Sequence, residues 1–173
     1  MGKRSVRENK NMFQLAREEA DLTRAEASEA LEFVSESRIE KIESEKSEPH
    51  PEEVLAMEKA YKKTGLCNYY CSQKCPIGQE YVPQIEVHDL SQIILEMLAS
   101  LNSVNKEKDR LIEITADGVI SDDELTDFAL IQNRLEKISL TIDSLQLWVN
   151  HTIASGSIDP DRLKEAQERA KNS

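Results

Sequence analysis

The chain has 173 residues, of which 39% are hydrophobic and 32% charged, and its net charge is −11. This length accommodates one or two small domains with a folded core, and the absence of an apolar run of about 18 residues excludes a membrane-spanning helix. Three cysteines without an export signal predict reduced thiols and a cytoplasmic location.

Low glycine and proline content predicts an all-α fold. The chain has only five residues of each kind, and long stretches without these helix breakers favour helices over a many-stranded sheet. We predict a helical domain over residues 1–66, an ordered connector rich in cysteine and tyrosine over 67–86, a helical hairpin over 87–156 and a polar tail over 157–173.

Capping signals predict four short helices in the first domain. Apolar residues at spacings of three and four indicate a helix over residues 11–20. Thr23 and the glutamate three residues later have the capping-box spacing that begins a second helix, and Ser35 is suited to cap a third. Pro51 would open the fourth helix as its first residue, and we expect Gly65 to end it.

Residues 11–65 resemble the helix-turn-helix domain of phage repressors, the XRE family. The resemblance rests on Leu15-Ala16-Arg17-Glu18-Glu19-Ala20, Leu22-Thr23, Ser35, Ile39, Ile42-Glu43 and Pro51. In such domains two helices joined by a tight turn place the second, the recognition helix, in the major groove of DNA. The resemblance therefore implies a bacterial transcriptional regulator whose partner is double-stranded DNA.

The resemblance also implies which residues touch DNA. Thr23 and Arg24 would contact the phosphate backbone, and Arg38 is suited to pair with guanine. The full predicted DNA-binding set is Arg17, Thr23, Arg24, Ser35, Ser37, Arg38 and Lys41. A basic arm ahead of the first helix would follow the backbone or the minor groove and contains Lys3, Arg4 and Arg7.

Departures from the family support an alternative interpretation beside DNA binding. Asp21 and Glu32 stand where the family usually has turn glycines, and residues 35–45 hold four glutamates against Arg38 and Lys41. Carboxylates near phosphates oppose DNA binding unless they accept from a cytosine amino group. The alternative function is a protein-interaction adaptor that keeps the XRE-like fold but no longer binds DNA.

The predicted connector contains all three cysteines at a spacing of four residues. On a helix this spacing places Cys67, Cys71 and Cys75 on one face, where thiolates could bind zinc or part of an iron–sulfur cluster and act as a sensor. The spacing is neither that of a zinc ribbon nor that of a ferredoxin, so His50 or His88 would have to supply a fourth ligand. The alternative is that the thiols only pack between the two domains, as free cysteine usually does.

Two heptad patterns follow the connector. Apolar residues recur at alternating steps of four and three over residues 90–111, with one miss at Lys108, and over 128–149 without a miss. Such repeats are typical of coiled coils, and the Asp117-Gly118 breaker predicts an antiparallel hairpin. Because the apolar stripes are too wide for an isolated pair, we expect a homodimer with a four-helix bundle; packing on the N-terminal domain or on another partner is the alternative.

No catalytic constellation is present in the sequence. The three histidines are scattered along the chain, and neither a glycine-rich phosphate loop nor a metalloprotease motif occurs. We therefore predict that the protein is not an enzyme and needs no cofactor other than a metal at the cysteines. The sequence as a whole predicts a dimeric DNA-binding regulator.

Overall fold

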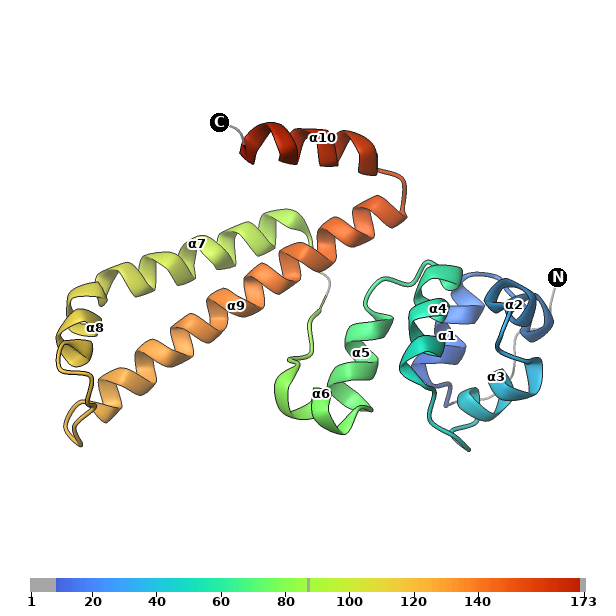
Figure 1. Cartoon of the computed structure of the whole chain (residues 1–173), viewed down its shortest axis with the longest axis horizontal. Helices are drawn as coiled ribbons and strands as arrows, with labels where there is room; N and C mark the ends of the chain where they lie inside the picture. The colour runs from blue at the N-terminus through green and yellow to red at the C-terminus, as the bar shows by residue number, and fades with distance from the viewer. Residues whose placement is uncertain (1–8, 87, 172–173) are drawn as a thin grey trace. The chain divides into compact units, whose positions relative to one another are not determined.

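The computed structural model describes residues 9–86 and 88–171, and this part of the chain is helical without strands (Figure 1). The predicted basic-arm residues Lys3, Arg4 and Arg7 lie outside the described residues. No helix in the described part is long and apolar enough to cross a membrane. The helices are α1 (Met12–Glu19), α2 (Arg24–Leu31), α3 (Glu36–Glu43), α4 (Pro51–Tyr61), α5 (Leu66–Gln73), α6 (Pro76–Tyr81), α7 (Leu90–Lys106), α8 (Lys108–Thr115), α9 (Leu125–Ala154) and α10 (Pro160–Lys171).

The first helices begin at the residues that the capping signals predict. The Thr23 hydroxyl accepts from the amide of Glu26 at 3.2 Å, and the Glu26 carboxylate accepts from the Thr23 amide at 2.7 Å. The Ser35 hydroxyl accepts from the Arg38 amide at 3.3 Å, and Pro51 is the first residue of α4. These bonds satisfy amide groups that have no partner within the helix, so the predicted starts of α2, α3 and α4 are confirmed.

Left-handed backbone conformations at non-glycine residues end several of these helices. Asp21 and Glu32, which stand where the family usually has glycine, have φ values of 56° and 59°. The prediction that Gly65 ends the fourth helix is wrong, because α4 ends at Tyr61 and Lys62 turns the chain with φ 52°. Gly65, with φ 95°, makes a second left-handed turn that begins α5. Two turns in succession return the chain to the core at Leu66, which is buried.

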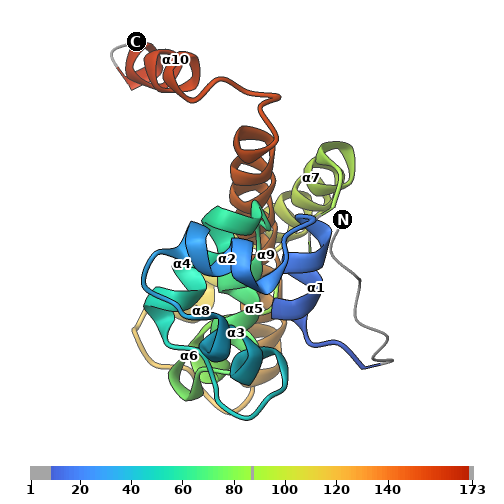
Figure 2. The same ribbon diagram turned by 90° about the vertical axis from the view of Figure 1, so that its right-hand side faces the viewer.

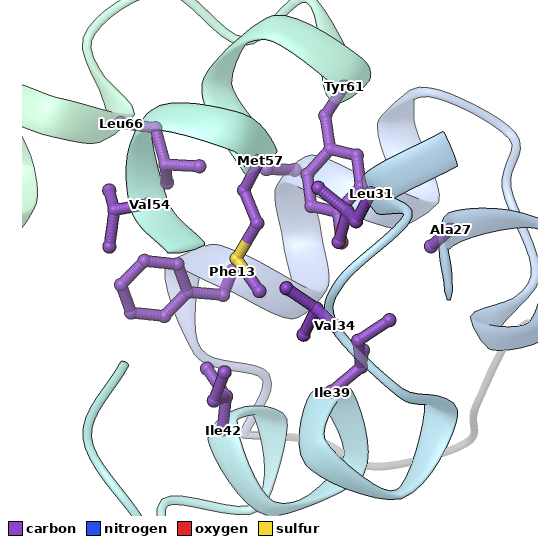
Figure 3. Packing of buried hydrophobic residues seen from close by; sticks show 11 residues of the cluster. Phe13, Ala27, Leu31, Val34, Ile39, Ile42, Val54, Met57, Tyr61 and Leu66 are labelled. Carbon is purple, nitrogen blue, oxygen red and sulfur yellow. The ribbon is translucent and has the colours of Figure 1, made fainter. Parts of the chain in front are cut away.

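Helices α1 to α5 enclose one apolar core (Figure 3). Its buried members are Phe13, Ala16, Ala27, Leu31, Val34, Ile39, Ile42, Val54, Met57, Tyr61 and Leu66. Full burial of each large aliphatic side chain contributes about 1.5–3 kcal/mol. The ring of Tyr69 on α5 meets the ring of Phe13 edge to face, with centroids 6.0 Å apart. The first helix of the predicted connector is therefore part of this N-terminal domain.

The second half of the connector is also helical and packs closely on α5. A Cβ atom at Gly78 on α6 would lie 2.0 Å from the carbonyl oxygen of Cys71, so only glycine allows this approach. The side chain of Asn68 donates to the carbonyl of Pro83 at 3.0 Å. Close backbone packing and this bond give the cysteine-rich segment a fixed structure.

Residues Ile85–Val149 form a second compact unit, a hairpin of α7 and α8 against α9. The first arm is interrupted at Glu107, where φ is −114°, next to the one miss in its heptad pattern. Gly118, with φ 73°, lies in the turn before α9, as the breaker predicts. The buried side chains of this unit are few: Ile93, Ile114, Ile131 and Thr141.

The predicted polar tail forms the helix α10. The Asp159 side chain accepts from the amides of Asp161 and Arg162 at 2.9 and 3.2 Å, which caps its first turn. No residue of α10 is buried, as expected for a helix with alternating charges on all sides.

Candidate nucleic-acid interface

Arg17 on α1 points into the interior of the N-terminal domain. Its Nε and Nη2 atoms donate to the two oxygens of the Glu43 carboxylate at 2.5 and 3.1 Å, and Nη1 donates to the Leu22 carbonyl at 2.6 Å. Burial opposes the charged form of Arg17, but the bonds to Glu43 outweigh it and raise the pKa of Arg17 above its ordinary value. Arg17 therefore joins α1 to α3, and this geometry gives no support to a DNA contact by its guanidinium.

Arg38 on α3 also makes internal bonds. Its Nε and Nη2 atoms donate to the Glu53 carboxylate at 2.8 and 2.7 Å. The remaining bonds hold the loop before α4, with Nη1 donating to the Ser47 hydroxyl at 2.5 Å and Nη2 to the Glu48 carbonyl at 2.9 Å. Contact between Arg38 and a guanine base would require these bonds to break.

Arg24, the first residue of α2, is held at one atom only. Its Nε donates to Glu43 at 2.8 Å, so Glu43 accepts from Arg17 and Arg24 together. The Arg24 side chain is 32% exposed, whereas that of Glu43 is 1% exposed. Within the described residues the two Nη atoms of Arg24 have no hydrogen-bond partner. A guanidinium that is fixed at Nε and partly exposed is suited to contact phosphate.

The other predicted contact residues lie at the starts of α2 and α3 or on the surface of α3. The hydroxyls of Thr23 and Ser35 already act as helix caps, and the hydroxyl of Ser37 lies 3.3 Å from that of Ser35. Ser37 and Lys41 are exposed, and Lys41 has no ion pair within the described part of the chain. Figure 2 shows α2 and α3 on one side of the domain, joined by a short turn.

Comparison with known proteins agrees with this local geometry. The family model described as Helix-turn-helix, HTH_3, matches residues 13–65. Residues 13–65 are a repressor-like helix-turn-helix domain. No curated protein and no solved structure matches the chain. The family match covers α1 to α4, and it ends at the residue before α5.

The exposed face of the helix-turn-helix is acidic. Five glutamates of α2, the turn and α3 are exposed: Glu26, Glu29, Glu32, Glu36 and Glu40. Lys41 and the partly exposed Arg24 are the basic residues beside them. Phe33 in the turn is 64% exposed, although phenylalanine is among the residues most often buried. The charge on this face opposes a close approach of phosphate except around Arg24 and Lys41.

Sequence reasoning missed that Glu43 and Glu53 bind the predicted DNA-contacting arginines. It placed Glu43 among the surface charges of the recognition helix, although Ile39, Ile42 and Glu43 have the i, i+3, i+4 spacing of one buried helix face. That spacing was the signal for an inward carboxylate that needs a cation. For Glu53 the only signal was its place at the third position of α4, where its carboxylate accepts from the His50 amide at 2.7 Å.

The cysteine segment is helical, and a metal at its three thiols stays a prediction. Cys67, Cys71 and Cys75 are free thiols and are partly buried. Burial raises the pKa of Cys67 to about 12, and the neighbouring Glu58 adds to this effect. In residues 9–86 and 88–171 no group of three or more His, Cys, Asp or Glu side chains is placed to hold a metal ion. The geometry of Cys67 is that of a packed, protonated thiol.

Proposed function

We propose that the protein is a transcriptional regulator that binds double-stranded DNA through its helix-turn-helix domain. The observation that carries this proposal is the helix-turn-helix match over residues 13–65, which coincides with helices that surround a complete core. A cytoplasmic location belongs to the same proposal, because a regulator must reach the chromosome.

Phosphate contact would come from the N-terminal end of α2 and from α3. Arg24 is held at Nε by Glu43, so its Nη atoms are free to donate to a phosphate without a large loss of side-chain entropy. Thr23 lies at the positive end of the helix dipole, and Lys41 on α3 adds an exposed cation. Arg17 and Arg38 would support this surface from inside rather than touch DNA.

Base recognition would depend on the exposed polar residues of α3. The hydroxyl of Ser37 is able to donate to or accept from the bases in the major groove. A carboxylate, by contrast, accepts well only from the amino group of cytosine. Glu36 and Glu40 would therefore favour sites with cytosine and disfavour other bases. Because few cations are exposed, non-specific affinity should be weak and the salt dependence shallow.

We also propose that the regulator acts as a dimer. Helix-turn-helix proteins usually read two half-sites about ten base pairs apart, and the hairpin exposes many apolar side chains that a second copy could cover. Two weakly binding domains on one dimer would gain affinity through their high effective concentration.

The second candidate function is a protein-interaction adaptor with no DNA binding. The observation that favours it is the acidic face of α2 and α3 with Phe33 exposed in the turn. A basic protein partner would tolerate this surface better than a phosphate backbone does. The two functions differ in what the same face binds, so one experiment separates them.

That experiment is selection from a random-sequence DNA pool at low salt, followed by sequencing of the retained DNA. We expect the wild-type protein to enrich a two-fold symmetric motif and the Arg24→Ala/Lys41→Ala variant to lose it. Lys59→Ala, which removes an exposed cation on α4, is the matched control and should behave as wild type. Absence of any enriched motif and of salt-dependent binding would overturn the DNA proposal in favour of the adaptor.

A further inference from the structure

The C-terminal end of α5 is a tight turn that contains two of the three cysteines. The amides of Lys74 and Cys75 donate to the same carbonyl, that of Tyr70, at 2.9 and 3.0 Å. Cys75 therefore stays beside the last turn of α5, which contains Cys71. Cys67 packs against the core, whereas Cys71 and Cys75 are partly buried outside it. These two thiols are a pair that the proposed DNA interface does not use.

The side chain of Lys74 holds this turn against the loop before α4. Its Nζ atom lies 3.5 Å from a carboxylate oxygen of Glu48. The Tyr70 hydroxyl lies at the same junction, because burial raises its pKa and the negative charges of Cys75, Cys71 and Glu48 add to this effect. Charges act on one hydroxyl in this way at short range. Both thiols therefore lie close to the ion pair that joins the turn to the loop.

Glu48 connects the turn to α3 through two different groups. Its carboxylate pairs with Lys74, and its main-chain carbonyl accepts from Nη2 of Arg38 at 2.9 Å. The guanidinium of Arg38 also donates to the hydroxyl of the preceding loop residue, Ser47, at 2.5 Å. One loop residue is thus bound to α3 on one side and to the residue between the two thiols on the other. A shift of the turn would reach α3 through these two contacts.

We propose that Cys71 and Cys75 are an oxidation site, and that a disulfide between them loosens the attachment of α3. The oxidant is a disulfide of low molecular mass, for which oxidised glutathione is the probe. The thiolate of one cysteine attacks it, forms a mixed disulfide and releases one glutathione thiolate. The thiolate of the other cysteine then attacks the cysteine sulfur of the mixed disulfide and releases the second glutathione. Two protein thiols are oxidised, and one glutathione disulfide is reduced to two thiols that take up both protons.

The new bond would tighten the turn. Cβ atoms four residues apart on a helix are about 5–6 Å apart, whereas a disulfide holds them at about 3.5–4.5 Å. Helix α5 is fixed by Leu66 in the core, and α6 already packs as closely on Cys71 as Gly78 allows. The shortening would therefore fall on Lys74, which would leave Glu48.

The inference deepens the proposed function and rests on it for one point, that α3 contacts DNA. The disulfide and the loosening of α3 are both measurable without DNA. Their failure is therefore distinguishable from a failure of the proposed function.

The first part of the test is peptide mapping of the full chain after incubation with oxidised glutathione. Trypsin cleaves after Lys74, so Cys71 is on the peptide 64–74 and Cys75 on the peptide 75–106. We expect mass spectrometry to find these two peptides linked. The intact mass of a single chain should be lower by two hydrogen atoms, which shows that the bond lies within one chain. Unmodified peptides, or peptides that each carry glutathione, would overturn the proposal.

Cysteine variants identify the pair, since the peptide 64–74 also contains Cys67. Cys71→Ser and Cys75→Ser should each abolish the link. Cys67→Ala is the matched control and should keep it. Circular dichroism checks that each variant retains its helices, and either serine variant alone is sufficient if the other does not fold. A link that persists in a folded serine variant would contradict the assignment.

The second part of the test is hydrogen–deuterium exchange of the reduced and the oxidised chain. We expect oxidation to speed amide exchange in residues 36–48 by about two- to fivefold, the range that loss of a partly exposed ion pair allows. Reduction with dithiothreitol should reverse the change, and α9 should exchange equally in both states. Glu48→Gln should exchange faster in residues 36–48 before oxidation and change little after it.

The outcomes separate this inference from the proposed function. A disulfide that leaves exchange in residues 36–48 unchanged would overturn the coupling to α3. A chain that forms the bond and loosens α3 but retains no DNA would remove only the proposed function. A chain that selects a DNA motif but forms no bond would remove only this inference.

Discussion

The two compact units of the chain differ in what they do with apolar and charged side chains. The helix-turn-helix domain buries its large apolar residues around Met57 and uses Arg17 and Arg38 as internal links. The hairpin buries few side chains and exposes leucines and isoleucines along both helices. The first unit encloses a complete core, whereas the second leaves many large apolar side chains exposed, as interaction surfaces do. The proposed function divides accordingly, with DNA binding assigned to the first unit and pairing to the second.

The largest expected effect comes from removing the buried carboxylate that the first unit depends on. Glu43→Ala would leave Arg17 buried without its partner, and loss of one member of a buried pair costs about 3–5 kcal/mol. This is a large part of the roughly 5–15 kcal/mol that stabilises a typical domain. Urea unfolding followed by far-UV circular dichroism measures the change.

The matched control for Glu43→Ala is Glu40→Ala on the same helix. Glu40 is exposed, so its removal should change the free energy of unfolding by less than about 0.5 kcal/mol. Equal effects of the two substitutions would show that Glu43 is not a structural link, and the contrast between the two units would fail.

The second prediction concerns pH and the Glu53 carboxylate. Burial alone would raise the pKa of Glu53, but the bonds from Arg38 and from the His50 amide outweigh burial and lower it below 4.5. A carboxyl group whose pKa is lowered on folding stabilises the fold above its unfolded pKa and loses that contribution as pH falls through the folded value. The contribution of Glu53 to the free energy of unfolding should therefore be constant near neutral pH. It should decrease as the pH falls below 4.5.

Urea midpoints measured between pH 7 and pH 3 test the Glu53 prediction. Glu53→Gln should be less stable than wild type at neutral pH and should lose less stability on acidification. Glu52→Gln, which changes the exposed neighbour, should keep the wild-type pH profile. A Glu53→Gln profile parallel to wild type would contradict the assignment.

The comparison of the two units also explains how much the sequence could predict. Local chemistry fixed the starts of helices, so Thr23, Ser35 and Pro51 were sufficient to predict α2, α3 and α4. Heptad spacing predicted the hairpin, and its miss at Lys108 marked the place where α7 and α8 separate. These features depend on residues close in sequence, which is why pattern and spacing were informative.

Long-range pairing was the part that the sequence could not supply. Arg38 and Glu53 are fifteen positions apart, and Arg17 and Glu43 are twenty-six apart, so nothing local showed that these charges meet. The predicted DNA-binding set therefore included two arginines that bind carboxylates of the same domain. The prediction that Gly65 ends α4 was wrong for a related reason: the chain turns earlier, at Lys62, between the buried side chains of Tyr61 and Leu66.

The smallest expected effect comes from an ion pair in the hairpin. Arg134→Ala removes the bonds to Ser103 and Glu107, but both ionic side chains are partly exposed, by 24% and 26%. Water can replace these contacts, and exposed pairs contribute about 0.2–1 kcal/mol. Trp148, the only tryptophan, lies on α9, so its fluorescence during urea unfolding reports on this helix. A loss as large as that of Glu43→Ala would mean that the bonds of Arg134 to Ser103 and Glu107 hold the hairpin together. A loss below about 1 kcal/mol would mean instead that apolar packing around Ile93 and Ile131 holds the arms together.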